Sequence, residues 1–469
     1  MFDQFYHQSS DQLKLSFLQK AFEKYPNLKN DFLEYYLRPN EKPLKMTIDD
    51  PDDFILASKD LIKDELEAIN INEPDWEYYV PRHSGYIPEH EAMEYLAEDE
   101  IGRFMKVYVS TVEKYCTDKH FDLAFLYMIS IYTACMEAEI DDAYDTFYDA
   151  NQTMLDQFEQ HLQECISLFK VINLSEDQLY TVATVLFDYG QQYDHDQNGL
   201  LTFFEFHLHS VIHSGTQAAI VLQVIEDKNA SESVPWLVTE LNKKTGGQQA
   251  WEKSAKQFFK KNKSVAHSLL EFYRIDNKTE FVRIARELWH DGIFQAEFAR
   301  LYFEVLEAQD DPDLYKEVTV HLNDLAFSEA YYRVLQSMMS PEERLSYIEK
   351  FKRYPPAYVQ ALCMEGKYDG ALEFAGQHTN RWNIFEIFTP CLQGQPKAAL
   401  VLLEKKIEDL LVDERGRNFY ARVANVLKIA IGIPAIKSDV EKLAFSIYSF
   451  YSRLSALRDE LRSAGLIKK

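Results

Sequence analysis

The chain has few of the residues that interrupt secondary structure and none of the cysteine spacings that hold disulfides or zinc. Its 469 residues include 15 glycines, 15 prolines and five cysteines. The cysteines are odd in number, scattered, and never spaced as C-x-x-C, which argues against a disulfide framework and against a zinc site. We therefore expect reduced cysteines inside helix cores and a cytoplasmic location. The five are Cys116, Cys135, Cys165, Cys363 and Cys391.

Signatures of catalysis are missing as well. The sequence contains no P-loop, no G-x-G-x-x-G, no G-x-S-x-G and no H-E-x-x-H. Glu287 and His290 form one Glu-x-x-His element, but a di-iron carboxylate site needs a second copy and two further glutamates. The sequence supports no enzyme assignment. A helical enzyme or effector whose active site is built from dispersed residues is the alternative to a binding protein.

Long apolar runs and an excess of positive charge are also absent. No apolar stretch reaches the roughly 20 residues of a membrane-spanning helix, and the first residues lack the pattern of a secretory signal. The formal net charge is −26, which argues against broad contact with nucleic acid or an anionic membrane and suits cations or basic partners. Lysines between residues 243 and 263 form the only concentrated positive patch, which we expect to meet the protein's own acidic surface or solvent.

What the chain does contain is helical periodicity. A hydrophobic content of 46% with apolar residues at helical spacing predicts an all-α fold. Residues 123–132 are apolar nearly all round, which is typical of a buried helix. We expect a helical N-terminal region over 1–170, a helical region with a cation loop over 171–270, and an α-solenoid of helical hairpins over 271–469.

The cation loop is the stretch from Asp194 to Glu205, which fills every constrained position of the pattern D-x-[DN]-x-[DN]-G-x₅-E. Calcium needs several hard oxygen ligands at flexible geometry, and this spacing supplies them from one tight turn around Gly199. The stretch resembles the EF-hand family, which implies Ca²⁺ as the bound cofactor. The implied ligands are Asp194, Asp196, Asn198, the carbonyl of Leu200, Thr202 (directly or through water) and Glu205.

The flanks agree with a helix on each side of this loop. Ser175 and Gln178 have the spacing of a capping box that opens a helix running into Tyr193. Gly190 departs from the family, which usually has an apolar side chain there, and we expect it to loosen the helix packing. No second loop is convincing, so Leu201, at the position that normally pairs with a partner loop, has no obvious partner.

Two other interpretations of the region remain open. The acidic loop could simply cap the second helix, because Asp, Asn and Gly are ordinary loop residues. Alternatively Glu205, His209 and His213, four residues apart, could bind a transition metal if they share one helix face.

An internal echo predicts the solenoid. The stretch from Cys363 to Leu372 recurs from Cys391 to Leu400, with glycine at the fourth position of both and an Ala-Leu pair at the end. The unit resembles a tetratricopeptide-like helical repeat. The function we expect is therefore calcium binding coupled to a protein or peptide partner on the repeat surface, with no nucleic acid. The partner, the oligomeric state, and whether calcium regulates or stabilises stay open.

Overall fold

The computed structural model describes residues 50–69, 89–142, 147, 149–164, 169, 172–193 and 199–467, without the side chains of 89–94 and 96. These residues form 21 α-helices, a 3-10 helix and no strand, which confirms the all-α prediction. No helix among them is long and apolar enough to cross a membrane. The chain divides into unit 1 (residues 1–271) and unit 2 (residues 272–469). The division into three regions stays a prediction.

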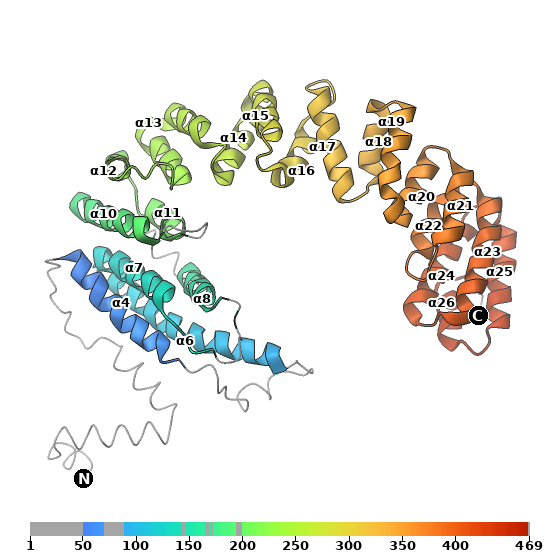
Figure 1. Ribbon diagram of the computed structural model, residues 1–469, viewed down its shortest axis with the longest axis horizontal. Helices are drawn as coiled ribbons and strands as arrows, with labels where there is room; N and C mark the ends of the chain where they lie inside the picture. Colours follow the sequence, from blue (N-terminus) through green and yellow to red (C-terminus); the bar gives the residue numbers. More distant parts are fainter. Residues whose placement is uncertain are drawn as a thin grey trace, which may run out of the picture. The chain divides into compact units, whose positions relative to one another are not determined.

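Unit 1 is assembled around one central helix, α7. The described helices of this unit, with α14 crossing into unit 2, are α4 (Pro51–Glu67), α6 (Glu89–Thr117), α7 (Phe121–Glu137), α8 (Ala150–Glu164), α10 (Glu176–Tyr193), α11 (Leu200–Ser210), α12 (Gly215–Asp227), α13 (Pro235–Phe258) and α14 (Lys263–Asp276). Helices α4, α6, α8 and α10 all pack against α7 (Figure 1).

Helix α7 takes this place because its sequence has no polar face. Twelve of its residues are buried, from Leu123 to Cys135, and its buried serine and threonine hydroxyls bond to backbone carbonyls of the same helix. Ser130 donates to the carbonyl of Leu126 and Thr133 to that of Ile129, both at 2.9 Å. Each large apolar side chain removed from water here stabilises the fold by about 1.5–3 kcal/mol. The prediction of a buried helix over 123–132 is confirmed.

Helix ends follow local capping chemistry. Asp50 caps α4 through a hydrogen bond from the backbone N–H of Asp52 (3.0 Å), and Pro51 occupies the first helical position, where its missing N–H is not needed. The predicted capping box before α10 is also formed. The backbone N–H of Gln178 donates to Ser175 Oγ (3.2 Å), and that of Ser175 donates to Gln178 Oε1 (3.1 Å).

Unit 2 is a succession of helical hairpins. After the end of α14 it comprises α15 (Lys278–His290), α16 (Gln295–Val305), α17 (Pro312–Leu325), α18 (Glu329–Met338), α19 (Pro341–Ile348), the 3-10 helix η2 (Glu349–Arg353), α20 (Pro355–Met364), α21 (Tyr368–His378), α22 (Ile384–Gly394), α23 (Pro396–Asp413), α24 (Arg417–Ile431), α25 (Lys437–Phe450) and α26 (Ser455–Ser463).

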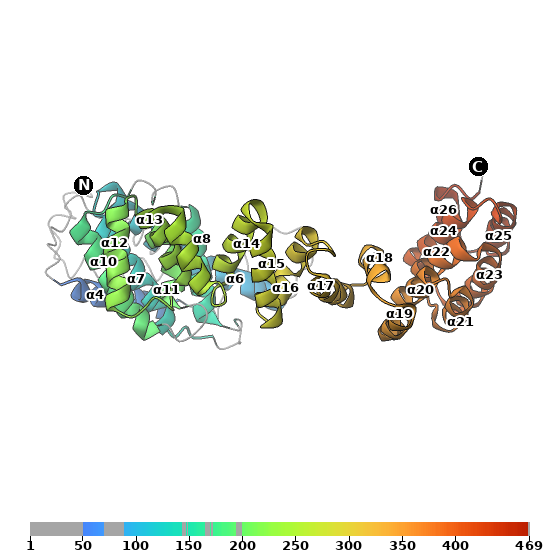
Figure 2. The same cartoon turned by 90° about the horizontal axis from the view of Figure 1, so that it is seen from above.

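The last helices of unit 2 form two layers. Helices α20, α22, α24 and α26 pack each against the next, and α21, α23 and α25 cover them on one side (Figures 1 and 2). A single buried apolar cluster runs through both layers from Tyr332 to Leu466. Each helical hairpin thus buries its apolar face against its neighbours, which is the arrangement of a helical-repeat fold.

The internal echo corresponds to the hairpins α20–α21 and α22–α23, but its two glycines act differently. Gly366 follows α20 with φ +69°, and the N–H of Lys367 donates to the carbonyl of Leu362 (2.9 Å) as in a Schellman motif. Gly394 lies within α22, where a Cβ would come 1.9 Å from the ring of Tyr368. Gly366 allows a left-handed turn, and Gly394 allows the ring of Tyr368 to approach the backbone of α22 closely.

The described cysteines behave as core residues. Cys116, Cys135, Cys363 and Cys391 are buried free thiols, and Cys165 lies outside the described residues. Cys363 and Cys391 occupy equivalent places in the echo, with their sulfurs 3.9 Å apart. Their role is therefore packing between successive hairpins.

Candidate functional site

The predicted calcium loop connects two helices of unit 1. Helix α10 ends at Tyr193 and α11 begins at Leu200, with Gly199 as its N-cap and the N–H of Phe203 bonded to the carbonyl of Gly199 (3.1 Å). Three of the predicted ligands, Asp194, Asp196 and Asn198, lie outside the described residues. Helices α10 and α11 therefore lie on either side of residues 194–198, as the flanks of the sequence pattern predicted.

Gly190 does not loosen the pair of helices, as the sequence had led us to expect. A Cβ at this position would lie 2.4 Å from Cγ and Cδ2 of Leu201, so the bare backbone lets the Leu201 side chain press directly against α10. Leu201 is only 2% exposed. It belongs to the first turn of α11, and its packing partner is Gly190 rather than a second loop.

Glu205, the predicted twelfth loop residue, faces a different helix. Its carboxylate lies near the backbone N–H of Leu237, in the first turn of α13, and this N–H favours the charged form of the carboxylate. The N–H groups of a first helical turn have no partner within the helix and attract negative charge. Burial raises the pKa of Glu205 to about 7, and the N–H of Leu237 opposes that shift.

The other two described ligands are part of α11. Leu200 is the first residue of the helix, so its carbonyl points along the helix axis toward the N–H of residue 204. Thr202 is exposed on the same helix. Among the described residues no group of three or more His, Cys, Asp or Glu side chains converges as a metal site would require.

The proposed histidine and glutamate face is not formed. Helix α11 ends at Ser210, so His213 lies beyond it, and its Nε2 is 2.7 Å from the carbonyl of Ile172. His209 stays on α11 and stands edge-on to the Trp236 ring at 5.2 Å. Burial, reinforced by nearby lysines 243 and 244, lowers the pKa of His209 to about 4. The interpretation in which Glu205, His209 and His213 together bind a transition metal is therefore wrong.

Lys244 joins α13 to the end of α11. Its ammonium group donates to the carbonyls of His209 (3.2 Å) and Ile212 (2.5 Å), two acceptors at the end of a helix that need partners. Burial lowers the pKa of Lys244, against the attraction of Glu240. We expected the lysine patch to contact the protein's own acidic surface or solvent. Lys244 does contact the protein itself, but its partners are backbone carbonyls rather than carboxylates.

The last residue of α10, on the N-terminal side of the predicted loop, is bonded to α7. Tyr193, the last residue of α10, donates its hydroxyl hydrogen to Glu137 at the end of α7. Lys59 of α4 reaches the same carboxylate at 3.0 Å. Burial alone would raise the pKa of Glu137, but the hydrogen bonds from Tyr193 and Lys59 outweigh it and lower the pKa. The N-terminal flank of the predicted loop is therefore anchored at Tyr193.

The sequence pattern identified the stretch 194–205 but not the groups that contact its flanking residues. Leu237, Glu137 and Lys244 carry no motif, and each acts through a contact with a residue that is 32 or more positions away in the chain. The one available signal was the cluster of lysines, which marked the neighbourhood of Lys244. No protein-family model matches the chain, and no curated protein sequence matches it.

Proposed function

We propose that the protein is a calcium-binding helical-repeat scaffold, in which loop 194–205 holds one Ca²⁺ and the repeat surface holds a protein partner. The observation that carries the proposal is the position of Glu205 beside α13. The residue whose spacing makes it the bidentate calcium ligand lies near the backbone N–H of Leu237, at the start of a neighbouring helix.

Calcium and α13 would compete for this carboxylate. An EF-hand loop uses both oxygens of its twelfth residue and the carbonyl of its seventh. To supply them, Glu205 would leave the N–H of Leu237 and the first turn of α11 would open at Leu200. Asp194, Asp196 and Asn198 complete the proposed ligand set, with Thr202 acting directly or through water.

The consequence would reach α13. Loss of a negative charge near a helix start typically costs about 0.3–1 kcal/mol. Helix α13 also touches α11 through the stacked rings of Phe206 and Trp236, 6.3 Å apart, and through Lys244. A change at Glu205 would therefore be felt at both the start and the middle of α13. Calcium binding would in this way bias one of two arrangements of α11 and α13.

The repeat surface of unit 2 supports the scaffold part of the proposal. Several large apolar side chains there are exposed at helix ends and turns, where a partner could cover them. They are Leu325 (66% exposed), Tyr354 (61%) and Trp382 (57%). Isolated apolar residues are common on any surface, so the partner site is argued separately below from polar groups.

The test is a calcium titration by calorimetry on the full chain, with Glu205→Gln and Glu226→Gln as variants. Glu226 is an exposed carboxylate of α12 and serves as the matched control. We expect a dissociation constant near the weak end of sensor sites, about 10⁻⁵ M or weaker. Glu205→Gln should weaken binding at least about tenfold, because it removes one charge and the bidentate contact. Glu226→Gln should leave it unchanged.

Thermal unfolding gives the second measurement. Calcium that binds only the folded protein raises the melting temperature, and the rise grows with the logarithm of the calcium concentration above the dissociation constant. A rise in the wild type that is lost in Glu205→Gln and kept in Glu226→Gln supports the site. Absence of heat and of any stabilisation at millimolar calcium would leave loop 194–205 as a connection between α10 and α11, and the proposal would be abandoned.

A further inference from the structure

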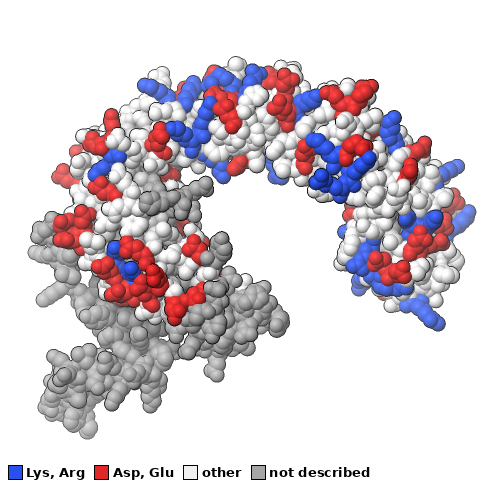
Figure 3. All heavy atoms as spheres, viewed as in Figure 1, with Lys and Arg blue, Asp and Glu red and all other residues white. Residues whose placement is uncertain are grey.

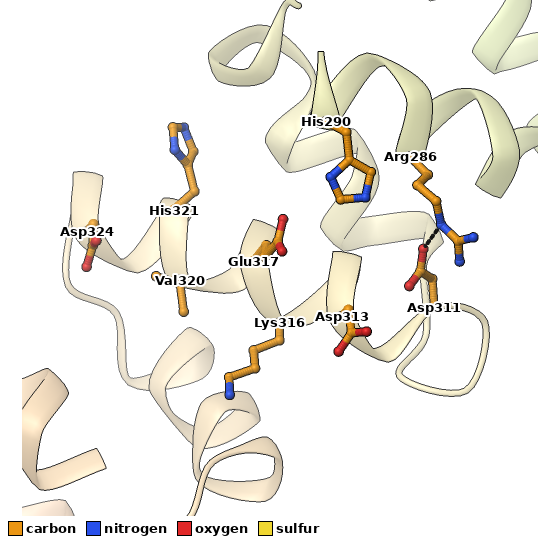
Figure 4. A pocket seen from close by; sticks show the side chains of 9 residues that line it. All are labelled: Arg286, His290, Asp311, Asp313, Lys316, Glu317, Val320, His321 and Asp324. Atoms are coloured by element: carbon orange, nitrogen blue, oxygen red, sulfur yellow. Dashed lines mark hydrogen bonds and ion pairs between the residues drawn. The ribbon is translucent and has the colours of Figure 1, made fainter. Parts of the chain in front are cut away.

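A polar pocket of about 820 Å³ lies between α15 and α17 in unit 2 (Figure 4). Its size falls within the roughly 300–1,000 Å³ of ligand-binding sites. Helix α15 contributes Arg286 and His290, while α17 and its N-cap supply the remaining side chains. The latter are Asp311, Asp313, Lys316, Glu317, Val320, His321 and Asp324.

The two cations of the pocket already have partners. Arg286 Nε lies 2.6 Å from Oδ2 of Asp311, whose other oxygen caps α17 through the N–H of Leu314 (3.2 Å). Lys316 Nζ is 3.3 Å from Glu343 Oε1, outside the pocket. A bound anion would have to break these pairs, so the pocket is poorly suited to phosphate or to an acidic segment.

The acceptors of the pocket are less fully used. Asp313 makes no hydrogen bond or close ion pair with a described residue. Glu317 receives one hydrogen bond, from the indole Nε1–H of Trp289 (3.0 Å), and this leaves its other oxygen open. Both carboxylates stand on the first half of α17. The unused capacity of the pocket therefore accepts hydrogen bonds and attracts positive charge.

The histidines add two more unused polar groups. His321 packs edge-on against Trp289 at 5.4 Å, and its Nε2 atom is buried without any hydrogen-bond partner. A buried polar atom left in this state is costly, so a ligand group that reached it would offset part of that cost. His290, on α15, is directed toward α17 in Figure 4. Polar groups thus approach the pocket from both helices.

We propose that this pocket binds a basic segment of a partner protein, with a lysine or arginine side chain between Asp313 and Glu317 and with polar backbone groups of the segment near His290 and His321. The inference rests on the proposed scaffold role and names the chemistry of its partner. Of the four carboxylates that line the pocket, Asp311 and Asp324 are paired with Arg286 and Lys350, whereas Asp313 and Glu317 have no ion pair with a described residue. Over the face of unit 2 in Figure 3, acidic and basic side chains are interspersed, so selectivity would come from the pocket rather than from a broad field.

The test compares two short fluorescent peptides, one rich in lysine and arginine and one rich in aspartate and glutamate, by anisotropy on the full chain. The pocket variant is Asp313→Asn with Glu317→Gln. The control is Glu404→Gln with Asp409→Asn on the exposed face of α23, which changes the net charge equally. We expect the basic peptide to bind the wild type, to bind the pocket variant about tenfold more weakly, and to bind the control within about twofold.

Trp289 offers a local signal. Because its indole N–H is bonded to Glu317, a ligand that engages this carboxylate should shift the tryptophan emission, and Trp289→Phe should abolish the shift. Equal weakening in pocket variant and control, preference for the acidic peptide, or no binding of the basic peptide would each overturn the inference. The calcium titration involves loop 194–205 in unit 1, so a failure here is distinguishable from a failure of the calcium proposal.

Discussion

The hydroxyl of Tyr193 donates a hydrogen bond to the carboxylate of Glu137, which ties the last residue of α10 to the end of α7. Lys59 satisfies the same carboxylate from α4. The N-terminal side of loop 194–205 is therefore fixed to the most deeply buried helix of unit 1.

Removing that anchor should destabilise unit 1. Tyr193→Phe deletes one hydrogen bond to a charged acceptor, and such bonds are worth about 1.5–3 kcal/mol when buried. Because Tyr193 is only partly buried, we expect about 1 kcal/mol in urea unfolding. Tyr180→Phe, which removes a hydroxyl from an exposed position of the same helix, is the control. Equal stability of the two variants would argue against the anchor.

Gly190→Ala should be destabilising although alanine favours helices. Its Cβ would lie 2.4 Å from the buried Leu201 side chain, and overpacking of this kind costs about 1–3 kcal/mol. Gly370→Ala in α21, where a Cβ would meet nothing within 4 Å, should instead be neutral or stabilising by up to about 1 kcal/mol. Thermal unfolding of both variants checks the contrast, and Leu201→Ala should partly relieve Gly190→Ala.

The two echo glycines should respond to different replacements. Gly366→Ala forces a side chain into φ +69° and should cost about 1–2 kcal/mol, whereas Gly366→Asn should cost less, because asparagine tolerates that conformation. For Gly394→Ala the obstacle is the Tyr368 ring, so Tyr368→Ala should reduce the loss at Gly394 and not at Gly366. The denaturant midpoints of the single and double variants test both expectations.

Glu365 should give unit 2 an acid-sensitive stability. Burial alone would raise its pKa, but hydrogen bonds from Arg344 (2.8 Å), Gln336 (2.9 Å) and Tyr332 (2.9 Å) outweigh it and lower the pKa below 4.5. Since the unfolded chain then binds more protons, this contribution is complete above about pH 4.5 and is lost as pH falls through the folded pKa. Glu365→Gln should flatten that part of the curve in urea unfolding across acidic pH. An unchanged slope would contradict the assignment.

Much of the fold could be predicted because it depends on local chemistry. The capping box of Ser175 and Gln178, the apolar α7 and the turn at Gly366 each follow from a few adjacent residues. The surroundings of loop 194–205 could not be predicted in the same way. The group of α13 that favours the charged form of Glu205 is the backbone N–H of Leu237, and a backbone group leaves no mark in the sequence.

The same limit explains the error over Gly190. A family pattern records which side chain is usual at a position, whereas the benefit of a missing side chain depends on what fills the space, here Leu201. The pocket between α15 and α17 was missed for a related reason. Residues such as Asp313 and His321 differ from other acidic residues and histidines only in having hydrogen-bonding atoms without a partner. Which atoms lack a partner depends on how the helices pack, and the sequence does not show this.

The layered end of unit 2 has a consequence for how the chain tolerates change. Since α20, α22, α24 and α26 each pack chiefly against the next, cooperativity runs along a line rather than through a single centre. A damaged hairpin would weaken its immediate neighbours first and more distant ones progressively less. Helix α26, with α24 and α25 as its main contacts, should therefore exchange its amide hydrogens sooner than α22 does, and unit 2 should lose its structure from an end inward.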